Sequence, residues 1–243
     1  MPARCRGHAA DDAGTLSGAR DRRCGRGHAT NEVAVNYFGH ASVASWRALP
    51  PAAVLGAMLP DFASMCGGKL AKDQRGELAD GVALHHHTDA IFHQLPPVTA
   101  LMHALEARLA ELGCKRGPQL AVGHIGIELM LDGALVDDGA FRDNYTSALE
   151  VDPAIAWMIE GDEQRFAALI ARLRGFGPPD DLKTTRSIVY RLQRVLGSRP
   201  RLRPDADDLV AIERALDEHQ PRVLAAADAV MRSMRAALAN DPK

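Results

Sequence analysis

Apolar residues of this chain recur every three or four positions from about Val33 onward, and no two segments show the alternation that is typical of paired strands. The pattern predicts an almost wholly helical protein, with proline pairs and glycines at the breaks. The predicted helices run from residue 51 toward 59 and over 77–92, 98–112, 118–136, 141–149, 153–159, 163–173, 182–196 and 206–240. Pro221 is expected to kink or divide the last of them.

The first 34 residues have a different composition. They are rich in arginine, glycine and small polar residues and contain almost no large apolar side chain. Such a segment cannot bury enough apolar surface to fold by itself. We therefore predict a disordered, Arg-rich extension over residues 1–34 and one all-helical domain, a multi-helix bundle, over residues 35–243.

Composition and charge limit the classes of function. The chain has 243 residues, a hydrophobic content of 47% and a formal net charge of −2, with a pI of about 6.5. This balance does not indicate a nucleic-acid-binding protein. No run approaches the roughly 18 apolar residues of a membrane span. Cys5, Cys24, Cys66 and Cys114 lie far apart without a Cys-x-x-Cys pair, which favours reduced thiols in a cytoplasmic protein.

Two segments carry metal-ligand residue types at helical spacing. Four residues advance a helix by only about 40° beyond one full turn, so residues four apart share a face. The two trios are His85, Asp89 and His93, and His124, Glu128 and Asp132.

Apolar residues flank both trios, which favours burial over a solvated surface. Burying carboxylates and imidazoles without partners costs several kcal/mol each, on the order of what a bound cation can offset. Facing helices also build the metal sites of helical bundles. The alternative is a set of satisfied core hydrogen bonds and surface charges. His40 and Asp61 also lie beside apolar segments, but each alone is more typical of a structural group or a helix cap.

The order of these segments resembles that of a known family. The segments are Asn36-Tyr-Phe-Gly-His40, Leu55-Gly-Ala-Met-Leu-Pro-Asp61-Phe62, Gly81-Val-Ala-Leu-His85-His-His-Thr-Asp89, Leu95-Pro96, Ile127-Glu128-Leu-Met-Leu-Asp132 and Arg199-Pro-Arg201-Leu202. Together they resemble the acyl carrier protein phosphodiesterase family over roughly residues 35–225. Each motif is short, but the shared order makes the resemblance fairly specific.

The resemblance implies an all-helical fold of the HD-phosphohydrolase type and a divalent metal, manganese first, with zinc or iron also possible. The family's reaction hydrolyses the serine phosphodiester of holo acyl carrier protein, a step of lipid metabolism, and releases 4′-phosphopantetheine. Family positions match His40, Asp61, His85, Asp89, Glu128 and Asp132 as metal ligands, with Asp61, Asp132 and His85 in catalysis. Hard cations accept such ligands and activate water.

The chain also departs from the family's pattern. Gly133 stands where the family has a histidine, Glu128 replaces an Asp, and His86 and His87 replace two arginines. His93 stands where the family usually has Asp, and His124 is additional. We expect His93 or His124 to supply the missing imidazole as a metal ligand, which shifts the preference toward zinc, iron or manganese. The alternative is a divergent member that binds metal or carrier protein without turnover, or that hydrolyses another phosphoester.

A basic segment lies between Asp181 and Asp205, where seven Lys and Arg residues occur without an acid. Acyl carrier proteins are acidic, and complementary charge speeds association. We therefore predict that Arg194, Arg199 and Arg201 bind the substrate. The alternatives are a solvated helix face, or internal pairing with the acid-rich segment over residues 128–163.

Overall fold

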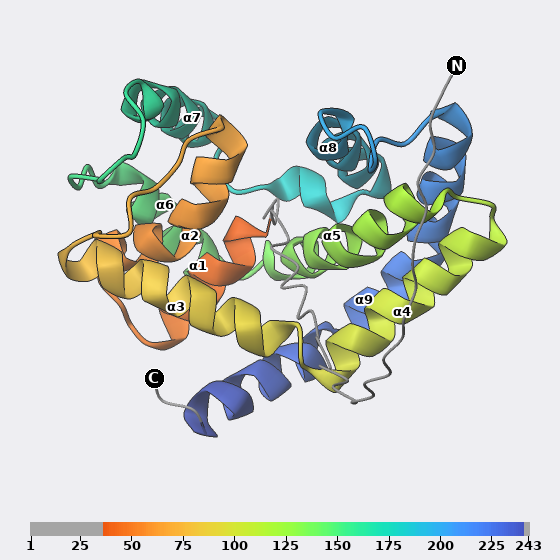
Figure 1. Cartoon of the computed structure of the whole chain (residues 1–243). Helices are drawn as coiled ribbons and strands as arrows, with labels where there is room; N and C mark the ends of the chain where they lie inside the picture. Colours follow the sequence, from red (N-terminus) through yellow and green to blue (C-terminus); the bar gives the residue numbers. More distant parts are fainter. Residues whose placement is uncertain (1–35, 241–243) are drawn as a thin grey trace, which may run out of the picture. The chain divides into compact units, whose positions relative to one another are not determined.

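The computed structural model describes residues 36–240, and the predicted extension over residues 1–34 lies outside the described residues. The described part is helical (Figure 1), so the prediction of an all-α fold is confirmed. Its helices are α1 Tyr37–Trp46, α2 Pro51–Cys66, α3 Gly76–Phe92, α4 Pro96–Glu111, α5 Arg116–Leu135, α6 Gly139–Glu150, α7 Asp162–Phe176, the short 3-10 helix η1 Asp180–Lys183, α8 Thr185–Gly197 and α9 Ala206–Asn240.

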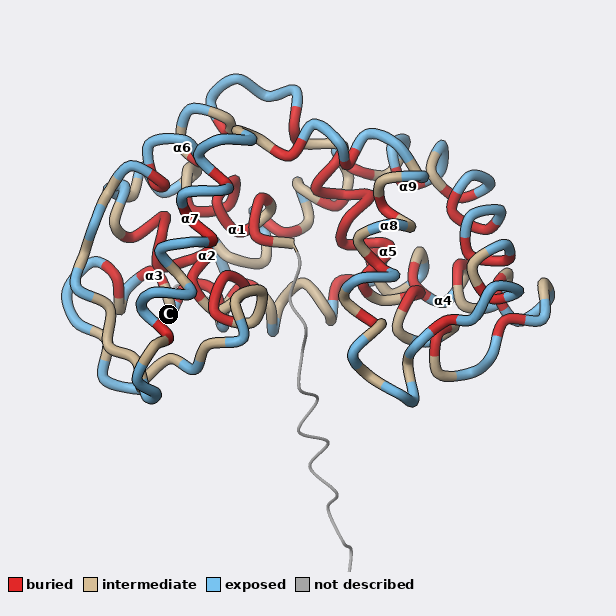
Figure 2. The backbone as a smooth tube through the Cα atoms, turned by 90° about the horizontal axis from the view of Figure 1, so that it is seen from above, coloured by how far each residue is buried: buried red, intermediate tan, exposed pale blue. Residues whose placement is uncertain are grey.

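The helices gather around two apolar cores, and the buried positions accordingly form two groups along the backbone (Figure 2). Helices α1, α2, α3, α6 and α7 supply most of one core, whose largest buried side chains include Tyr37, Phe38, Phe62 and Tyr145. Helices α4, α5, α8 and α9 supply most of the other, which includes Leu105, Ile127, Leu129 and Leu216. The candidate ligands come from α1, α2, α3 and α5, so they lie where the two groups of helices meet.

Helices α2 and α3 cross with their backbones in contact at Gly56 and Gly81. A Cβ atom on Gly81 would lie 2.0 Å from the carbonyl oxygen of Ala53 and 2.7 Å from the Cα atom of Gly56. Only glycine permits so close an approach. The crossing brings Asp61 on α2 and His85 on α3 to the same region of the molecule.

Helix α1 was not among the predicted helices, and its start is stabilised from a distant segment. The backbone N–H groups of Phe38 and Gly39 donate hydrogen bonds to the Asp132 carboxylate at 3.2 and 2.8 Å. Asp132 on α5 therefore satisfies N–H groups that every helix leaves open in its first turn. The local side chain at the cap position, Asn36, makes no such bond.

The predicted helix over residues 153–159 is wrong, because this segment is extended and pairs with the chain that follows α2. The N–H of Ala71 donates to the carbonyl of Ala156 at 3.0 Å, and the N–H of Met158 donates to that of Lys69 at 2.9 Å. An isolated bridge forms at Leu70 and Trp157. Backbone partners from another segment thus outweigh the local helical pattern.

Two prolines, Pro60 and Pro221, lie inside helices that continue past them. Helix α2 continues through Pro60 to Cys66, rather than stopping near residue 59, and burial of Asp61, Phe62 and Ala63 accompanies this last part. Pro221 likewise lies inside α9 without dividing it. Packing of the apolar face offsets the hydrogen bond that each proline removes.

Among the described helices, none is by itself long and apolar enough to cross a membrane. Helices α5 and α6 reach the length and apolar composition of a membrane span only when they are taken together, and this pair is bent by 107° at the break between them.

Candidate metal centre

Three buried side chains from three helices form an inner cluster: His40 on α1, Asp61 on α2 and His85 on α3. One ligand atom from each lies within 4.8 Å of the others. Asp61 is fully buried, and the two imidazoles are each 5% exposed. The cluster therefore brings together His85, the first residue of the first trio, with His40 and Asp61, which belong to neither trio.

Hydrogen bonds fix both imidazoles of the inner cluster in one tautomer. His85 Nδ1 lies 2.9 Å from the carbonyl oxygen of Ala57, which can only accept, so this nitrogen carries the proton. The Thr88 hydroxyl donates to the carbonyl of His85 at 2.9 Å, so it accepts a hydrogen bond from His40 Nδ1 at 3.1 Å. Each ring therefore keeps its Nε2 lone pair for another partner. Metal-binding histidines are oriented in this way.

Burial keeps these imidazoles uncharged. It lowers the pKa of His40 well below 6.5, with a further contribution from the His85 ring, whose centroid lies 4.0 Å away. Burial likewise lowers the pKa of His85, to about 4. His40 Nε2 is buried and has no hydrogen-bond partner among the described residues. The cluster thus offers neutral imidazole nitrogens beside the carboxyl group of Asp61, a combination of ligand types that fits a divalent cation.

A second group, the outer cluster, consists of His93, His124 and Glu128, with Asp89 next to it. His124 Nε2 lies 2.9 Å and His93 Nε2 3.6 Å from Glu128 Oε1, and one ligand atom from each of the three lies within 4.8 Å of the others. Asp89 Oδ1 lies 3.2 Å from His93 Nε2. The cluster joins the end of α3 to the middle of α5.

The outer cluster is partly open to solvent, and the contact between Asp89 and His93 favours the charged form of both side chains. The side chains of His93 and His124 are 25% and 38% exposed. Burial alone would lower the pKa of His93, but the hydrogen bond with Asp89 and the charge of Glu128 raise it above 6.5. Burial would raise the pKa of Asp89, whereas its bond with His93 lowers that pKa to about 2.

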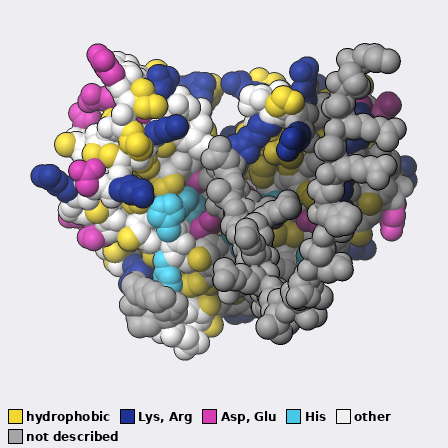
Figure 3. Space-filling model, viewed as in Figure 1, with side chains coloured by type: hydrophobic (Ala, Val, Ile, Leu, Met, Phe, Trp, Pro, Cys, Tyr) yellow, Lys and Arg dark blue, Asp and Glu magenta, His cyan; other side chains and the backbone are white. Residues whose placement is uncertain are grey.

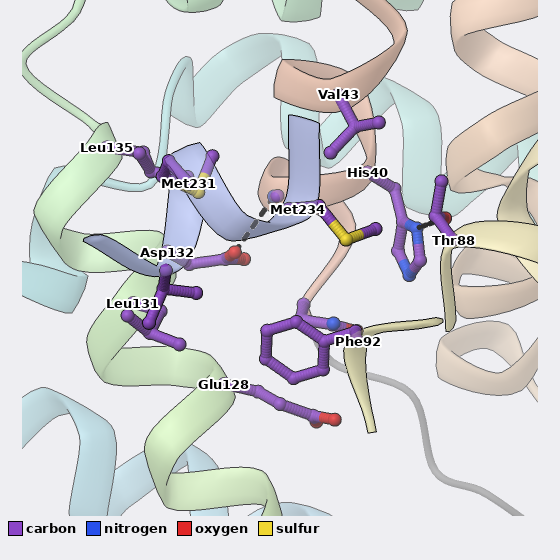
Figure 4. A pocket seen from close by; sticks show the side chains of 13 residues that line it. His40, Val43, Thr88, Phe92, Glu128, Leu131, Asp132, Leu135, Met231 and Met234 are labelled. Carbon is purple, nitrogen blue, oxygen red and sulfur yellow. Dashed lines mark hydrogen bonds between the residues drawn. The ribbon is translucent and has the colours of Figure 1, made fainter. Parts of the chain in front are cut away.

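A cavity of about 50 Å³ touches residues of both clusters (Figure 4). His40, Thr88, Glu128 and Asp132 supply its polar wall, and the hydrogen bond between His40 and Thr88 is drawn in the figure. The apolar wall includes Val43, Phe92, Leu131, Leu135, Val230, Met231 and Met234. The cavity has room for water.

Asp132, predicted as both a ligand and a catalytic acid, belongs to neither cluster. Its carboxylate accepts the two hydrogen bonds from the start of α1 and reaches the cavity wall. Burial raises its pKa well above 3.8, and the charge of Glu128 adds to this, while the bond from Gly39 opposes it. Asp132 thus positions α1, and with it His40.

At Gly133, where the resemblance leads us to expect a histidine, the fold leaves no room for one. A Cβ atom there would lie 2.4 Å from the carbonyl oxygen of Leu182 in η1. An imidazole at this position would displace the η1 backbone. His93 and His124, the residues expected to replace it, do lie with a carboxylate, but in the outer cluster.

Of the three arginines predicted to bind the substrate, two line the same groove and one does not. Arg194 and Arg199 line a groove of about 790 Å³ between the end of α7 and α8, where the surface is hollowed and Lys and Arg side chains gather (Figure 3). Arg201 does not line it. The backbone carbonyl of Arg201 instead packs against Gly117 at the start of α5.

Part of the basic segment pairs internally. Arg191 donates two hydrogen bonds to Asp181 and one, at 3.3 Å, to the hydroxyl of Tyr37. Lys183 forms ion pairs with Asp137 and Asp180, and of these two acids only Asp137 lies in the acid-rich segment over residues 128–163.

Thr88 and the Ala57 carbonyl were not recognised from the sequence. Thr88 lies three residues after His85, a helical spacing that was available as a signal for its bond to the His85 carbonyl. Its bond to His40 could not be foreseen, since α1 itself was not predicted. The bond of His85 to the Ala57 carbonyl could not be predicted either, because every residue has a backbone carbonyl.

No protein family, curated protein or solved structure matches this chain. The resemblance to acyl carrier protein phosphodiesterases therefore rests on the order of the short motifs alone.

Proposed function

We propose that this protein is a metal-dependent phosphodiester hydrolase of the HD-phosphohydrolase type. We further propose that it removes 4′-phosphopantetheine from holo acyl carrier protein. The inner cluster carries the proposal: His40, Asp61 and His85 are buried together, their imidazoles are neutral, and both Nδ1 atoms are already engaged. Buried ionisable groups that converge in this way are typical of functional sites.

His40 and His85 would hold the cation through Nε2, and Asp61 through its carboxylate. A divalent ion held there would polarise a phosphoryl oxygen and make water more acidic. Manganese suits this mixture of imidazole and carboxylate, and zinc and iron also accept it. The protein's own contribution is to fix the two rings through Thr88 and Ala57 and to exclude bulk water.

The groove between α7 and α8 supports an acidic protein as the substrate. Arg172, Arg194 and Arg199 line it together with Tyr37, the first residue of α1. His40 follows Tyr37 by three residues, so about one helical turn connects the groove to the inner cluster. Arginine forms paired hydrogen bonds with carboxylate and phosphate groups. A carrier protein docked in the groove would place its serine-linked arm near α1.

One observation favours a second candidate function. The backbone of Leu182 fills the space that an imidazole at position 133 requires. A centre without that ligand fits a divergent protein that binds metal or carrier protein without turnover, or one that acts on another phosphoester. The two candidates differ in whether a product appears.

Purified protein, stripped of metal and then supplied with Mn²⁺, should convert holo acyl carrier protein to the apo form. A gel shift and mass spectrometry detect apo carrier protein and free 4′-phosphopantetheine. Asp61→Asn should lower the rate by more than about 100-fold, because even the loss of a partner behind a metal ligand costs roughly 10- to 100-fold. His103→Ala is the matched control, since His103 is an exposed histidine on α4.

The outcomes separate the candidates. Hydrolysis of a small phosphodiester, with intact holo carrier protein, would keep the hydrolase and reject the carrier protein as substrate. Binding of metal or carrier protein without any product would favour the second candidate. Equal rates for the wild-type protein and Asp61→Asn would refute the inner cluster as the reaction centre.

A further inference from the structure

The outer cluster directs two imidazole nitrogens at one carboxylate oxygen. Nε2 of His124 and Nε2 of His93 lie 2.9 and 3.6 Å from the same atom, Glu128 Oε1. The two rings meet edge to face, with centroids 4.5 Å apart. A second carboxylate oxygen, Asp89 Oδ1, lies 3.2 Å from His93 Nε2. Three ligand atoms thus lie within 4.8 Å of one another, and the Asp89 oxygen lies next to one of them.

We propose that His93, His124 and Glu128 form a second divalent-cation site of the zinc class, separate from the inner cluster. Two imidazoles and one carboxylate are a donor set of zinc sites that keep a position open for water or another ligand. Asp89 lies beside His93 as a further carboxylate for the same ion. None of these residues takes part in the inner cluster, which draws on α1, α2 and the middle of α3.

The environment of the site fits a cation better than an internal ion pair alone. Glu128 is 5% exposed, Asp89 is 19% exposed, and an oxygen of each lies within 3.6 Å of His93 Nε2. Two carboxylates that share one imidazole in a poorly solvated setting repel each other. A dication between them and the imidazole lone pairs offsets this repulsion.

The site also differs from the inner cluster in access. The side chain of His124 is 38% exposed, so an ion can enter and leave without opening the core. The side chains of the inner cluster, in contrast, belong to residues that are at most 5% exposed. We therefore infer that the outer site exchanges its metal readily and that the inner site does so slowly. This inference is independent of the proposed hydrolytic activity.

The test measures how many zinc ions bind to each molecule of the full-length protein. Metal-free protein is titrated with Zn²⁺ and, as a spectroscopic substitute, with Co²⁺, and the stoichiometry is measured by equilibrium dialysis and elemental analysis. His93→Ala and His124→Ala should each bind one equivalent fewer than the wild type under conditions that saturate it. The visible absorption of the cobalt bound at this site should disappear in both. His103→Ala should retain the full stoichiometry and spectrum.

Glu128→Gln is a second variant, because it keeps the size of a buried side chain; it too should lose one equivalent. Circular dichroism confirms that each variant is folded. Unchanged stoichiometry and cobalt spectra in folded His93→Ala and His124→Ala would overturn the proposal. Failure of the zinc- or manganese-loaded protein to hydrolyse any phosphodiester would refute the proposed function and leave this site in place.

Discussion

The inner and outer clusters use the same kinds of side chain in opposite environments. In the inner cluster, backbone and hydroxyl groups hold the imidazoles, and burial keeps them neutral. In the outer cluster, carboxylates hold them, and the pKa of His93 is raised. The groups around His40, His85 and His93 thus determine whether burial lowers the pKa of the imidazole or carboxylates raise it.

The comparison also shows how each cluster is assembled. The inner cluster needs three helices in close contact, and its geometry depends on the crossing of α2 and α3 at glycines. The outer cluster needs only one face of α3 near one face of α5. The inner cluster should therefore be sensitive to packing and the outer cluster tolerant of it. Four predictions test this difference.

The largest effect is expected from Gly81→Ala. Its Cβ atom would lie 2.0 Å from the carbonyl oxygen of Ala53, so α2 and α3 must separate. We expect a loss of about 3 kcal/mol of stability, as for overpacked cores. The melting temperature should fall by roughly 6–12 °C in calorimetry. Gly139→Ala is the control, because nothing lies within 4 Å of its Cβ position. Equal melting temperatures in the two variants would contradict the close backbone contact between α2 and α3 at Gly81.

Thr88→Val should weaken metal binding at the inner cluster. The change keeps the shape of the side chain but removes the hydroxyl that holds His40 Nδ1. Loss of such a partner typically costs about 10- to 100-fold in metal affinity. Competition titration with a chelator measures this. In the control, Thr99→Val, the lost hydroxyl bonds only to the backbone of α4. An effect of the same size on the outer cluster would contradict the separation of the two sites.

The two clusters should respond oppositely to pH in metal-free protein. His85 has a folded-state pKa of about 4, below 6.5, so the unfolded state binds more protons between these values. Its contribution to stability is therefore lost as the pH falls through this window. His93 has a raised pKa, so its contribution is present below pH 6.5 and is lost as the pH rises through the folded-state pKa. NMR titration of the ring protons measures both midpoints. A midpoint of His85 above that of His93 would reverse the comparison.

The smallest effect concerns docking in the groove between α7 and α8, which contains no residue of either cluster. Arg194→Glu with Arg199→Glu should raise KM for holo carrier protein several-fold and leave kcat nearly unchanged, because these side chains line the groove and not the clusters. The effect should shrink with added salt, since exposed charges are screened over about 8 Å at physiological ionic strength. Arg222→Glu, an exposed change on α9, is the control. A salt-independent loss of kcat would instead implicate the groove in the chemistry.

The sequence determined the all-helical fold and most helices, because apolar spacing and proline or glycine breaks are local signals. It also pointed to every ligand-type residue of both clusters. The spacing of four selected His85, His93, His124 and Glu128, whereas only the order of the motifs selected His40 and Asp61. It failed at residues 153–159, where the partner of the backbone lies in the segment after α2. It failed again at α1, where the capping carboxylate comes from Asp132.

Only the tertiary structure decided how the ligands are grouped. The first trio is divided, with His85 in the inner cluster and His93 in the outer one. Helix α3 packs against α2 at His85, whereas His93, just after the end of α3, reaches side chains of α5. The same packing places the Leu182 carbonyl against Gly133 and Thr88 against His40. Spacing along a helix fixes which side chains share a face, whereas the crossing of helices fixes which atoms meet.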